Sequence, residues 1–281
     1  MLGKHSFRGL EAVFAFDNWP MLLAGRLFDR KTGCVAYRKK GFDILVDHRG
    51  GDQCGTRMCI ATDMYSRYLP AFNVRGPVRV LDLGANGGGF PLMLRIAGVE
   101  LARVVSVEMN PLTYRRLQVN LTTNLGQSAV AINAAVCGTL GSEIPMTPSR
   151  GGTGDSMYQE RVESSAPPVL VPTTTFQALY DQYFENEDID ICKIDIEGAE
   201  FDLFASSPDE LVKKIRYLVI EIHYHYDQGT AKAKILTERL KALGFVDITI
   251  EETHRTNFLA EVRAFAGPGA VSVSAPGRSA A

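Results

Sequence analysis

The chain has 281 residues, enough for one large α/β domain or for a domain with an extension. Of these residues 46% are hydrophobic and 22% are charged, which is ordinary for a soluble globular protein. Its formal net charge is −2, which does not suggest a polyanion-binding surface, so nucleic acid is not expected as the main partner. Charged residues interrupt the apolar stretches near the N-terminus, which argues against a membrane span there. The five scattered cysteines contain no CxxC pair and favour free thiols in a reducing cytoplasm.

Residues 1–77 lack a repeating α/β pattern, and we expect them to form an extension that closes over the substrate and cofactor sites. Within them, CVAYRKKGFDILV predicts a hairpin that turns at Lys40-Gly41. A glycine-rich loop, HRGGDQCG, precedes a short helix that we expect to end at Pro70. The aromatic residues of this helix either line an acceptor pocket or pack in the core: Tyr65, Tyr68 and Phe72.

Residues 78–266 alternate apolar runs with helical stretches, the pattern of a doubly wound parallel α/β sheet. We expect strands at 78–83, 102–108, 129–136, 189–195, 216–224, 245–251 and 258–266, and helices at 89–97, 111–124, 174–185, 198–206 and 229–243. The segment 138–168 has no clear periodicity and is either a lid loop or a disordered insertion. The Gly/Ala/Ser/Pro-rich tail, 267–281, is predicted to be disordered.

The stretch VLDLGANGGGF, residues 80–90, places a glycine turn directly after the first predicted strand. A P-loop requires Lys-Ser/Thr after the glycines, and a dinucleotide fingerprint requires glycine at the position of Asn86, so both fail. The remaining pattern, D-x-G-x-x-x-G from Asp82 to Gly88, suits a cofactor without a pyrophosphate, because a carboxylate at this point would repel a diphosphate. The same carboxylate would suit a cationic methionyl amine. A glycine turn required only by backbone geometry is the alternative.

A second acid, Glu108, ends the next predicted strand, 26 residues after Asp82. Adjacent strands of a doubly wound sheet end at the same edge, so a carboxylate here can accept both ribose hydroxyls. An exposed glutamate at a strand end without a ligand is the simpler alternative.

Two later strand ends carry further ionisable groups. In KIDIEGAE, residues 193–200, strand alternation places Lys193, Asp195 and Glu197 toward one side. Glu197 is alternatively an ordinary acid at a helix start. In LVIEIHYHY, Glu221, His223 and His225 share one face. These groups predict a carboxylate–imidazole cluster, serving either as a general base or as a divalent metal site, with His225 more simply a packed side chain.

The four motifs VLDLGANGGGF, VEMNP, KIDIEGAE and VIEIH, in this order, resemble the FkbM-type family of S-adenosylmethionine-dependent class I methyltransferases, over roughly residues 45–265. The resemblance implies a Rossmann-like sheet of seven strands with the last antiparallel. It also implies O-methylation of a hydroxyl on a small molecule such as a natural product, sugar or glycolipid, in secondary metabolism.

The resemblance further implies roles for individual residues. Asp82, Gly84, Asn86 and Gly88 frame the methionyl part of S-adenosylmethionine, and Glu108 with Asn110 holds the ribose side of the cofactor. Asp195, Glu197 and His223 face the methyl acceptor as the catalytic residues. The run Gly87-Gly88-Gly89 holds more glycine than the family's common turn.

Two other functions stay open. A non-catalytic module that binds the cofactor or a partner protein can use the same fold. An NAD-dependent oxidoreductase is disfavoured by Asn86 at the third glycine position and by the early Asp82. The sequence leaves the acceptor, a metal requirement and the oligomeric state undetermined.

Overall fold

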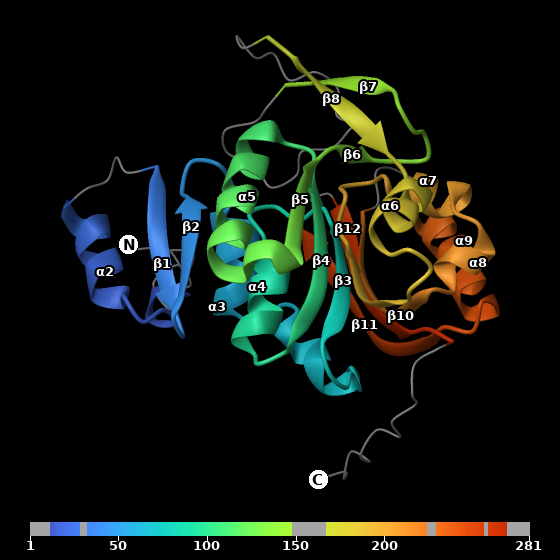
Figure 1. The fold of residues 1–281 in the computed structure, drawn as a ribbon, viewed down its shortest axis with the longest axis horizontal. Helices are drawn as coiled ribbons and strands as arrows, with labels where there is room; N and C mark the ends of the chain where they lie inside the picture. The colour runs from blue at the N-terminus through green and yellow to red at the C-terminus, as the bar shows by residue number, and fades with distance from the viewer. Residues whose placement is uncertain (1–11, 29–32, 148–166, 224–228, 256–257, 269–281) are drawn as a thin grey trace.

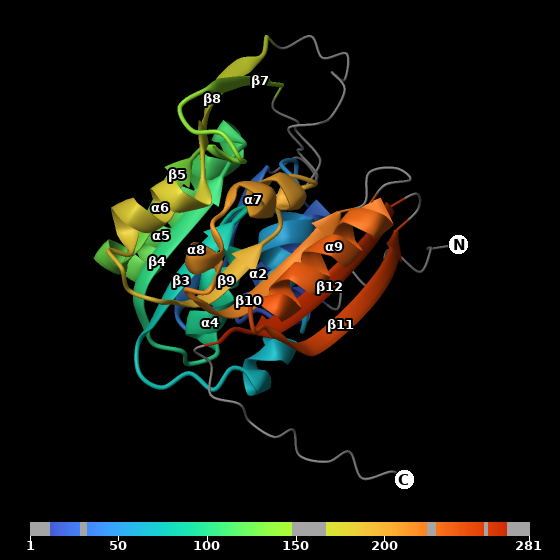
Figure 2. The same ribbon diagram turned by 90° about the vertical axis from the view of Figure 1, so that its right-hand side faces the viewer.

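The computed structural model describes residues 12–28, 33–147, 167–223, 229–255 and 258–268. Its centre is a seven-stranded sheet in the order β11-β12-β10-β9-β3-β4-β5 (Figures 1 and 2). In chain order these strands are β3 (Val78–Leu83), β4 (Leu101–Glu108), β5 (Ala129–Asn133), β9 (Ile189–Ile194), β10 (Ile215–His223), β11 (Val246–Arg255) and β12 (Phe258–Ala266).

Parallel pairing joins five of the seven strands, β10, β9, β3, β4 and β5, and β11 and β12 complete the sheet by antiparallel pairing. The last strand, β12, is antiparallel to both β10 and β11. Only two residues separate β11 from β12, and such a short connection can join only antiparallel strands. Because β3, β4, β9 and β10 run parallel to one another, their carboxyl ends meet at one edge of the sheet.

Helices cover both faces of the sheet, because its central strands are apolar on both sides. Leu81 and Leu83 of β3 pack in a core with the helices α6, α7, α8 and α9. Val78 and Val80 face the other way, into a core with α4 and the N-terminal segment. The helices are α4 (Gly89–Ile96), α5 (Pro111–Leu125), α6 (Phe176–Tyr183), α7 (Glu200–Ser206), α8 (Asp209–Val212) and α9 (Gly229–Ala242).

The N-terminal segment contains the predicted hairpin, formed by β1 (Cys34–Lys39) and β2 (Phe42–Asp47), beside α5 (Figure 1). Lys40 and Gly41 have φ values of 49° and 84°, the left-handed pair that a two-residue turn of this kind requires. The other elements are α2 (Trp19–Phe28), the π-helix η1 (Gln53–Arg57), α3 (Met58–Ala61) and the 3-10 helix η2 (Ser66–Ala71). Pro70 lies inside η2, so the prediction of one helix ending at that proline was wrong.

A small sheet of order β6-β8-β7 projects from the top of the molecule in both views (Figures 1 and 2). Its strands are β6 (Ala135–Val136), β7 (Glu143–Met146) and β8 (Val169–Thr174). The expected strand over 129–136 is thus divided between two sheets, and the segment 138–168, expected to be irregular, contributes β7. Pro145 and Pro172 remove strand N–H groups and make the sequence resemble a loop.

Residues 148–166 of the predicted lid and 269–281 of the predicted tail lie outside the described residues. Among the helices that are described, none has the length and apolar character needed to cross a membrane.

Candidate active site

The glycine turn after β3 lies in backbone contact with the end of β9. Gly84 has a φ of +74°, and a Cβ atom on it would lie 1.7 Å from the carbonyl oxygen of Asp195. The Asp195 N–H donates to the carbonyl of Leu83 at 3.0 Å. Only glycine fits at position 84, because both its conformation and its neighbour exclude a side chain. The predicted cofactor turn and the predicted acceptor site are therefore direct neighbours.

Asp82 lies beneath this turn, with its side chain fully buried. Its carboxylate is 3.6 Å from the Lys193 Nζ, which also donates to the carbonyl of Gly84 at 2.7 Å. Burial raises the pKa of Asp82 to about 6, although the charge of Lys193 opposes this shift. Among the described residues, the two carboxylate oxygens of Asp82 have no hydrogen-bond partner. Its predicted contact with a methionyl amine stays a prediction.

Glu108 lies beside the turn at the end of β4, and two backbone groups orient its carboxylate. The Asn86 N–H donates to Oε2 at 2.9 Å, and the Asn110 N–H donates to Oε1 at 2.8 Å. Asn110 caps α5, because its side-chain oxygen accepts from the N–H groups of Leu112 and Thr113. This capping role explains the asparagine at position 110 without any contact to a cofactor. Each carboxylate oxygen has two acceptor sites, so the two backbone bonds are compatible with a diol ligand.

The N-terminal segment contributes Thr56 of η1, which sequence reasoning did not identify. Its hydroxyl donates to the Asn86 side-chain oxygen at 2.8 Å and accepts from the Gly87 N–H at 2.8 Å. A Cβ atom on Gly87 would lie 2.5 Å from that hydroxyl, and one on Gly89 would lie 2.8 Å from the Thr56 Cα. The unusual run of glycines is thus explained by the close approach of η1, and it was the one signal of this contact in the sequence.

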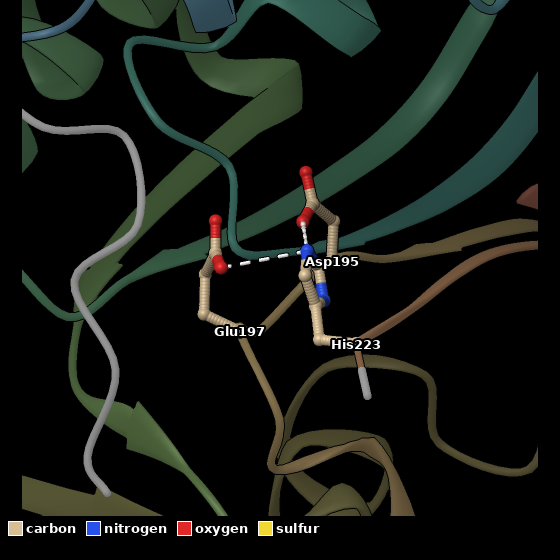
Figure 3. Close-up of side chains that lie close together, drawn as sticks. All are labelled: Asp195, Glu197 and His223. Carbon is tan, nitrogen blue, oxygen red and sulfur yellow. Dashed lines mark ion pairs between the residues drawn. The ribbon is translucent and has the colours of Figure 1, made fainter. Parts of the chain in front are cut away.

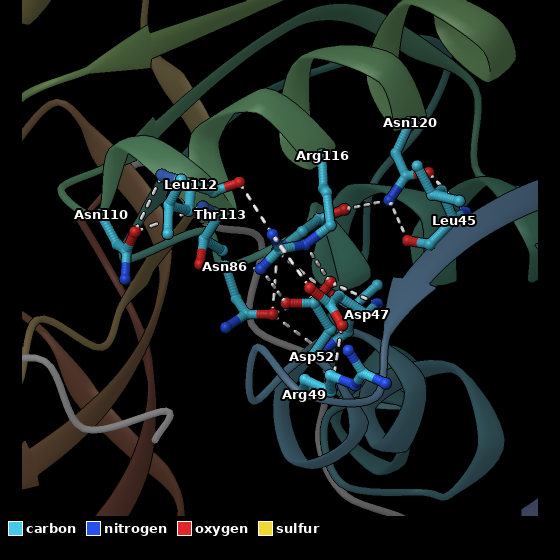
Figure 4. A network of polar contacts seen from close by, with 12 residues as sticks. Leu45, Asp47, Arg49, Asp52, Asn86, Asn110, Leu112, Thr113, Arg116 and Asn120 are labelled. Carbon is cyan, nitrogen blue, oxygen red and sulfur yellow. Dashed lines mark hydrogen bonds and ion pairs between the residues drawn. The ribbon is translucent and has the colours of Figure 1, made fainter. Parts of the chain in front are cut away.

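A buried ion pair holds η1 against α5 (Figure 4). The Arg116 guanidinium contacts both carboxylate oxygens of Asp52, at 2.5 Å from Nε and 2.7 Å from Nη2. Asp52 is fully buried and also accepts from the Asp47 N–H. The polar network continues to Asn120, which bonds the Gly87 carbonyl. No local pattern predicted these contacts, because they join residues far apart in the chain.

The second part of the site is an imidazole surrounded by carboxylates (Figure 3). The Nε2 of His223, at the end of β10, lies 3.8 Å from Asp195, 3.4 Å from Glu197 and 3.8 Å from Glu221. Its Nδ1 lies 3.0 Å from Oε1 of Glu200, the first residue of α7, which is fully buried. The structure therefore brings the three predicted catalytic residues together and adds Glu200. The buried acid in KIDIEGAE was visible in the sequence, but its contact with His223 was not.

These neighbours shift the pKa values of the cluster. Burial lowers the pKa of His223, but the hydrogen bond to Glu200 and the charges of Asp195 and Glu197 outweigh burial and raise it to about 10. Burial, together with the nearby acids, raises the pKa of Glu197 to about 7. For Asp195 burial opposes ionisation, but Lys193 and His223 prevail and lower its pKa. At neutral pH His223 is protonated and Asp195 is ionised.

Tyr65 closes the cluster from the N-terminal segment. Its hydroxyl lies 3.4 Å from both Asp195 and Glu221. Burial, reinforced by these acids, raises its pKa well above the ordinary value, so the hydroxyl stays protonated and able to donate. Tyr65 is also part of the buried core that contains Tyr68 and Phe72, and His225 is outside the described residues.

Two features meet at this edge of the sheet: a strand-end acid beside a glycine turn, and a carboxylate–imidazole cluster. Such an arrangement is suited to group transfer between two bound reactants. The chain belongs to the FkbM methyltransferase family: the model of the methyltransferase FkbM domain matches residues 82–246. This is a family of S-adenosylmethionine-dependent methyltransferases.

Individual relatives match less of the chain. A 77-residue stretch is 36% identical to the AMB antimetabolite synthetase AmbE of Pseudomonas aeruginosa, covering 25% of this chain and 4% of that protein. The FkbM methyltransferase of Methylobacillus flagellatus has 16% identity and a TM-score of 0.44, over 70% of this chain and 46% of that one. The tRNA m1G37 methyltransferase of M. jannaschii has 10% identity and a TM-score of 0.47, over 84% and 55%. The chain thus spans about half the length of these two structures.

Proposed function

We propose that this protein transfers a methyl group from S-adenosylmethionine to a hydroxyl group of a small molecule, such as a natural product, a sugar or a glycolipid. One observation carries the proposal: the glycine turn beside Glu108 is in backbone contact with Asp195 of the ionised cluster, through Gly84. Two reactants bound at these neighbouring places would be held in mutual alignment, which contributes about 7–11 kcal/mol to such reactions.

The residues at the turn fit this cofactor. Glu108 presents a carboxylate that backbone N–H groups already orient, as the ribose hydroxyls require. Asp82, Gly84, Asn86 and Gly88 would surround the methionyl part, and Asn110 would fix the far end of the Glu108 carboxylate. The bound cofactor supplies an electrophilic methyl group on a sulfonium.

At the acceptor, Asp195, Glu197 and His223 would position the hydroxyl and receive its proton. The hydroxyl oxygen would accept the methyl group that the cofactor supplies, the electron pair of the broken carbon–sulfur bond would remain with the cofactor's sulfur, and the hydroxyl proton would pass to a carboxylate. The lowered pKa of Asp195 keeps this carboxylate ionised at neutral pH and so able to take up a proton, and the raised pKa of Glu197, about 7, makes Glu197 the stronger base of the two. The raised pKa of His223 favours an orienting role for the imidazolium over the role of general base.

The proposal also assigns a role to each segment of the chain. Residues 1–77 would act as a cap, 78–266 as the methyltransferase domain, 138–168 as a lid and 267–281 as a tail. Tyr65 supports the cap assignment, because it reaches the cluster from the N-terminal segment. The net charge of −2 supports a small-molecule acceptor over nucleic acid. The free cysteines support a place in the reducing cytoplasm.

The first test is calorimetric titration with S-adenosylhomocysteine and, as a control, a separate titration with NAD. We expect S-adenosylhomocysteine to bind and Glu108→Ala to weaken that binding, while Glu187→Gln, which alters an acid paired with Arg79 at the opposite end of β3, leaves it unchanged. Binding of NAD with no binding of S-adenosylhomocysteine would support an oxidoreductase and overturn the proposal.

The second test is methyl transfer from labelled S-adenosylmethionine to a panel of small hydroxyl compounds. With an acceptor in hand, we expect Asp195→Asn to lower turnover by about 10²–10⁴-fold with cofactor affinity retained. Turnover within about threefold of the wild type would remove Asp195 from the chemistry. Cofactor binding without transfer to any acceptor would favour the non-catalytic module.

A further inference from the structure

Four carboxylates converge on one imidazole in the acceptor half of the site. Asp195, Glu197 and Glu221 lie within 3.8 Å of the His223 Nε2, and Glu200 lies 3.0 Å from its Nδ1. The side chains are no more than 25% exposed, and that of Glu200 is fully buried. The proton on His223 and the Lys193 ammonium, 3.2 Å from Asp195, offset part of this negative charge, and a divalent cation that displaces the His223 proton would offset more of it.

The orientation of the imidazole matches that of a metal ligand. Glu200 holds Nδ1. Nε2 faces the carboxylates of Asp195 and Glu197 (Figure 3). Metal-binding histidines are characteristically held in this way by a carboxylate on the second ring nitrogen. Glu200 is itself anchored, because its Oε1 accepts the N–H groups of Ile196 and Gly198.

The spacing of the donor atoms also suits one ion. Ligand atoms of Asp195, Glu197 and His223 all lie within 4.8 Å of one another. Two atoms bound to the same ion at about 2.1 Å are at most about 4.2 Å apart. The distances of 3.8 Å and 3.4 Å from Nε2 to the two carboxylates already meet this limit. Small rotations of the side chains would complete a coordination sphere.

We propose that Asp195, Glu197 and His223 bind a divalent cation, with Glu200 as the residue that positions His223. Two carboxylates and one imidazole favour a cation of the Mn²⁺ or Mg²⁺ class over metals that seek thiolates. The role of the ion rests on the proposed function: beside the glycine turn it would bind the acceptor hydroxyl and lower the pKa of that group.

The test is titration of the EDTA-treated full chain with Mn²⁺ alone, followed by calorimetry and electron paramagnetic resonance. We expect one bound ion, with nitrogen coupling from the imidazole that disappears in His223→Gln. Asp195→Asn should weaken binding by at least about tenfold, and Glu200→Gln by about 10–100-fold. Glu210→Gln, which changes an exposed acid of α8, should bind Mn²⁺ as the wild type does.

Two results would overturn the proposal: wild-type binding weaker than about 1 mM, or a bound ion without nitrogen coupling. Equal affinity in wild type and Glu200→Gln would remove the positioning role of Glu200. If Asp195→Asn fails to fold, the nitrogen coupling of the wild type decides the question. Titration with S-adenosylhomocysteine separates the two proposals. If the protein binds S-adenosylhomocysteine but not Mn²⁺, the metal proposal is refuted and the proposed function stands. If it binds Mn²⁺ but not S-adenosylhomocysteine, the cofactor site is refuted and the metal site stands.

Discussion

The substitution Asp52→Asn tests whether the N-terminal segment is held on the glycine turn by its buried ion pair. The change leaves the Arg116 guanidinium, 8% exposed, without the carboxylate that contacts it at 2.5 and 2.7 Å. Removing one partner of a buried pair costs about 3–5 kcal/mol. We expect the lower part of this range, about 3 kcal/mol, because Asp47 remains 3.7 Å from the guanidinium. At about 2–4 °C per kcal/mol, the melting temperature should fall by about 6–12 °C.

The assays are urea unfolding and thermal unfolding, both monitored by circular dichroism, with S-adenosylhomocysteine affinity measured in parallel. Affinity should also fall, because Thr56, close in sequence to Asp52, contacts Asn86 and Gly87. The matched control is Asp43→Asn, which breaks an exposed pair with Arg38 in the same segment and should cost less than about 1 kcal/mol. An Asp52→Asn loss no larger than that of the control would refute the reasoning. Asp52→Leu combined with Arg116→Met removes both charges and should recover much of the loss.

Two further predictions concern the turn. Gly84→Ala should prevent stable folding, because its Cβ would meet the Asp195 carbonyl at 1.7 Å, whereas Gly98→Ala, with nothing within 4 Å, should cost only about 1 kcal/mol for its left-handed backbone. Similar unfolding midpoints for the two variants would contradict this. Burial raises the pKa of Asp82 from 3.8 to about 6, so the folded protein binds a proton that the unfolded chain releases. As the pH rises from about 4 to 6, the free energy of unfolding of the wild type relative to Asp82→Asn should therefore fall by up to about 3 kcal/mol, and it should stay constant at higher pH. Urea unfolding at several pH values measures this difference. A rise between about pH 4 and 6 would show that the pKa of Asp82 is not raised.

Much of the main sheet was predictable from local pattern. The apolar runs of β3, β4, β9 and β10 each carry an ionisable residue at or next to the carboxyl end of the strand, and the left-handed turn at Lys40-Gly41 follows from two residues alone. The helix α5 was predicted from Pro111 at its first position, where the missing N–H costs nothing. Such signals depend on neighbours in the chain, so the sequence contains them completely.

The small sheet was not predictable in the same way. Its strands β7 and β8 contain Pro145 and Pro172 and gain their regularity from pairing with each other. The division of the expected strand at 129–136 likewise depends on where β8 lies, because β6 pairs with β8 and not with the main sheet. Strand pairing between distant segments leaves little trace in either segment alone.

The sequence by itself determined the turn geometry, the acids at the strand ends and, through its motifs, the FkbM methyltransferase family. Only the tertiary structure decided that Thr56 packs on the glycine turn across 31 residues of chain and that Arg116 pairs with Asp52 across 64. It also decided that Glu200 holds His223 and that the carboxylates around this histidine raise its pKa. The physical reason is that a pKa or an ion pair depends on burial and on the charges nearby, and both are set by contacts between segments that are distant in sequence.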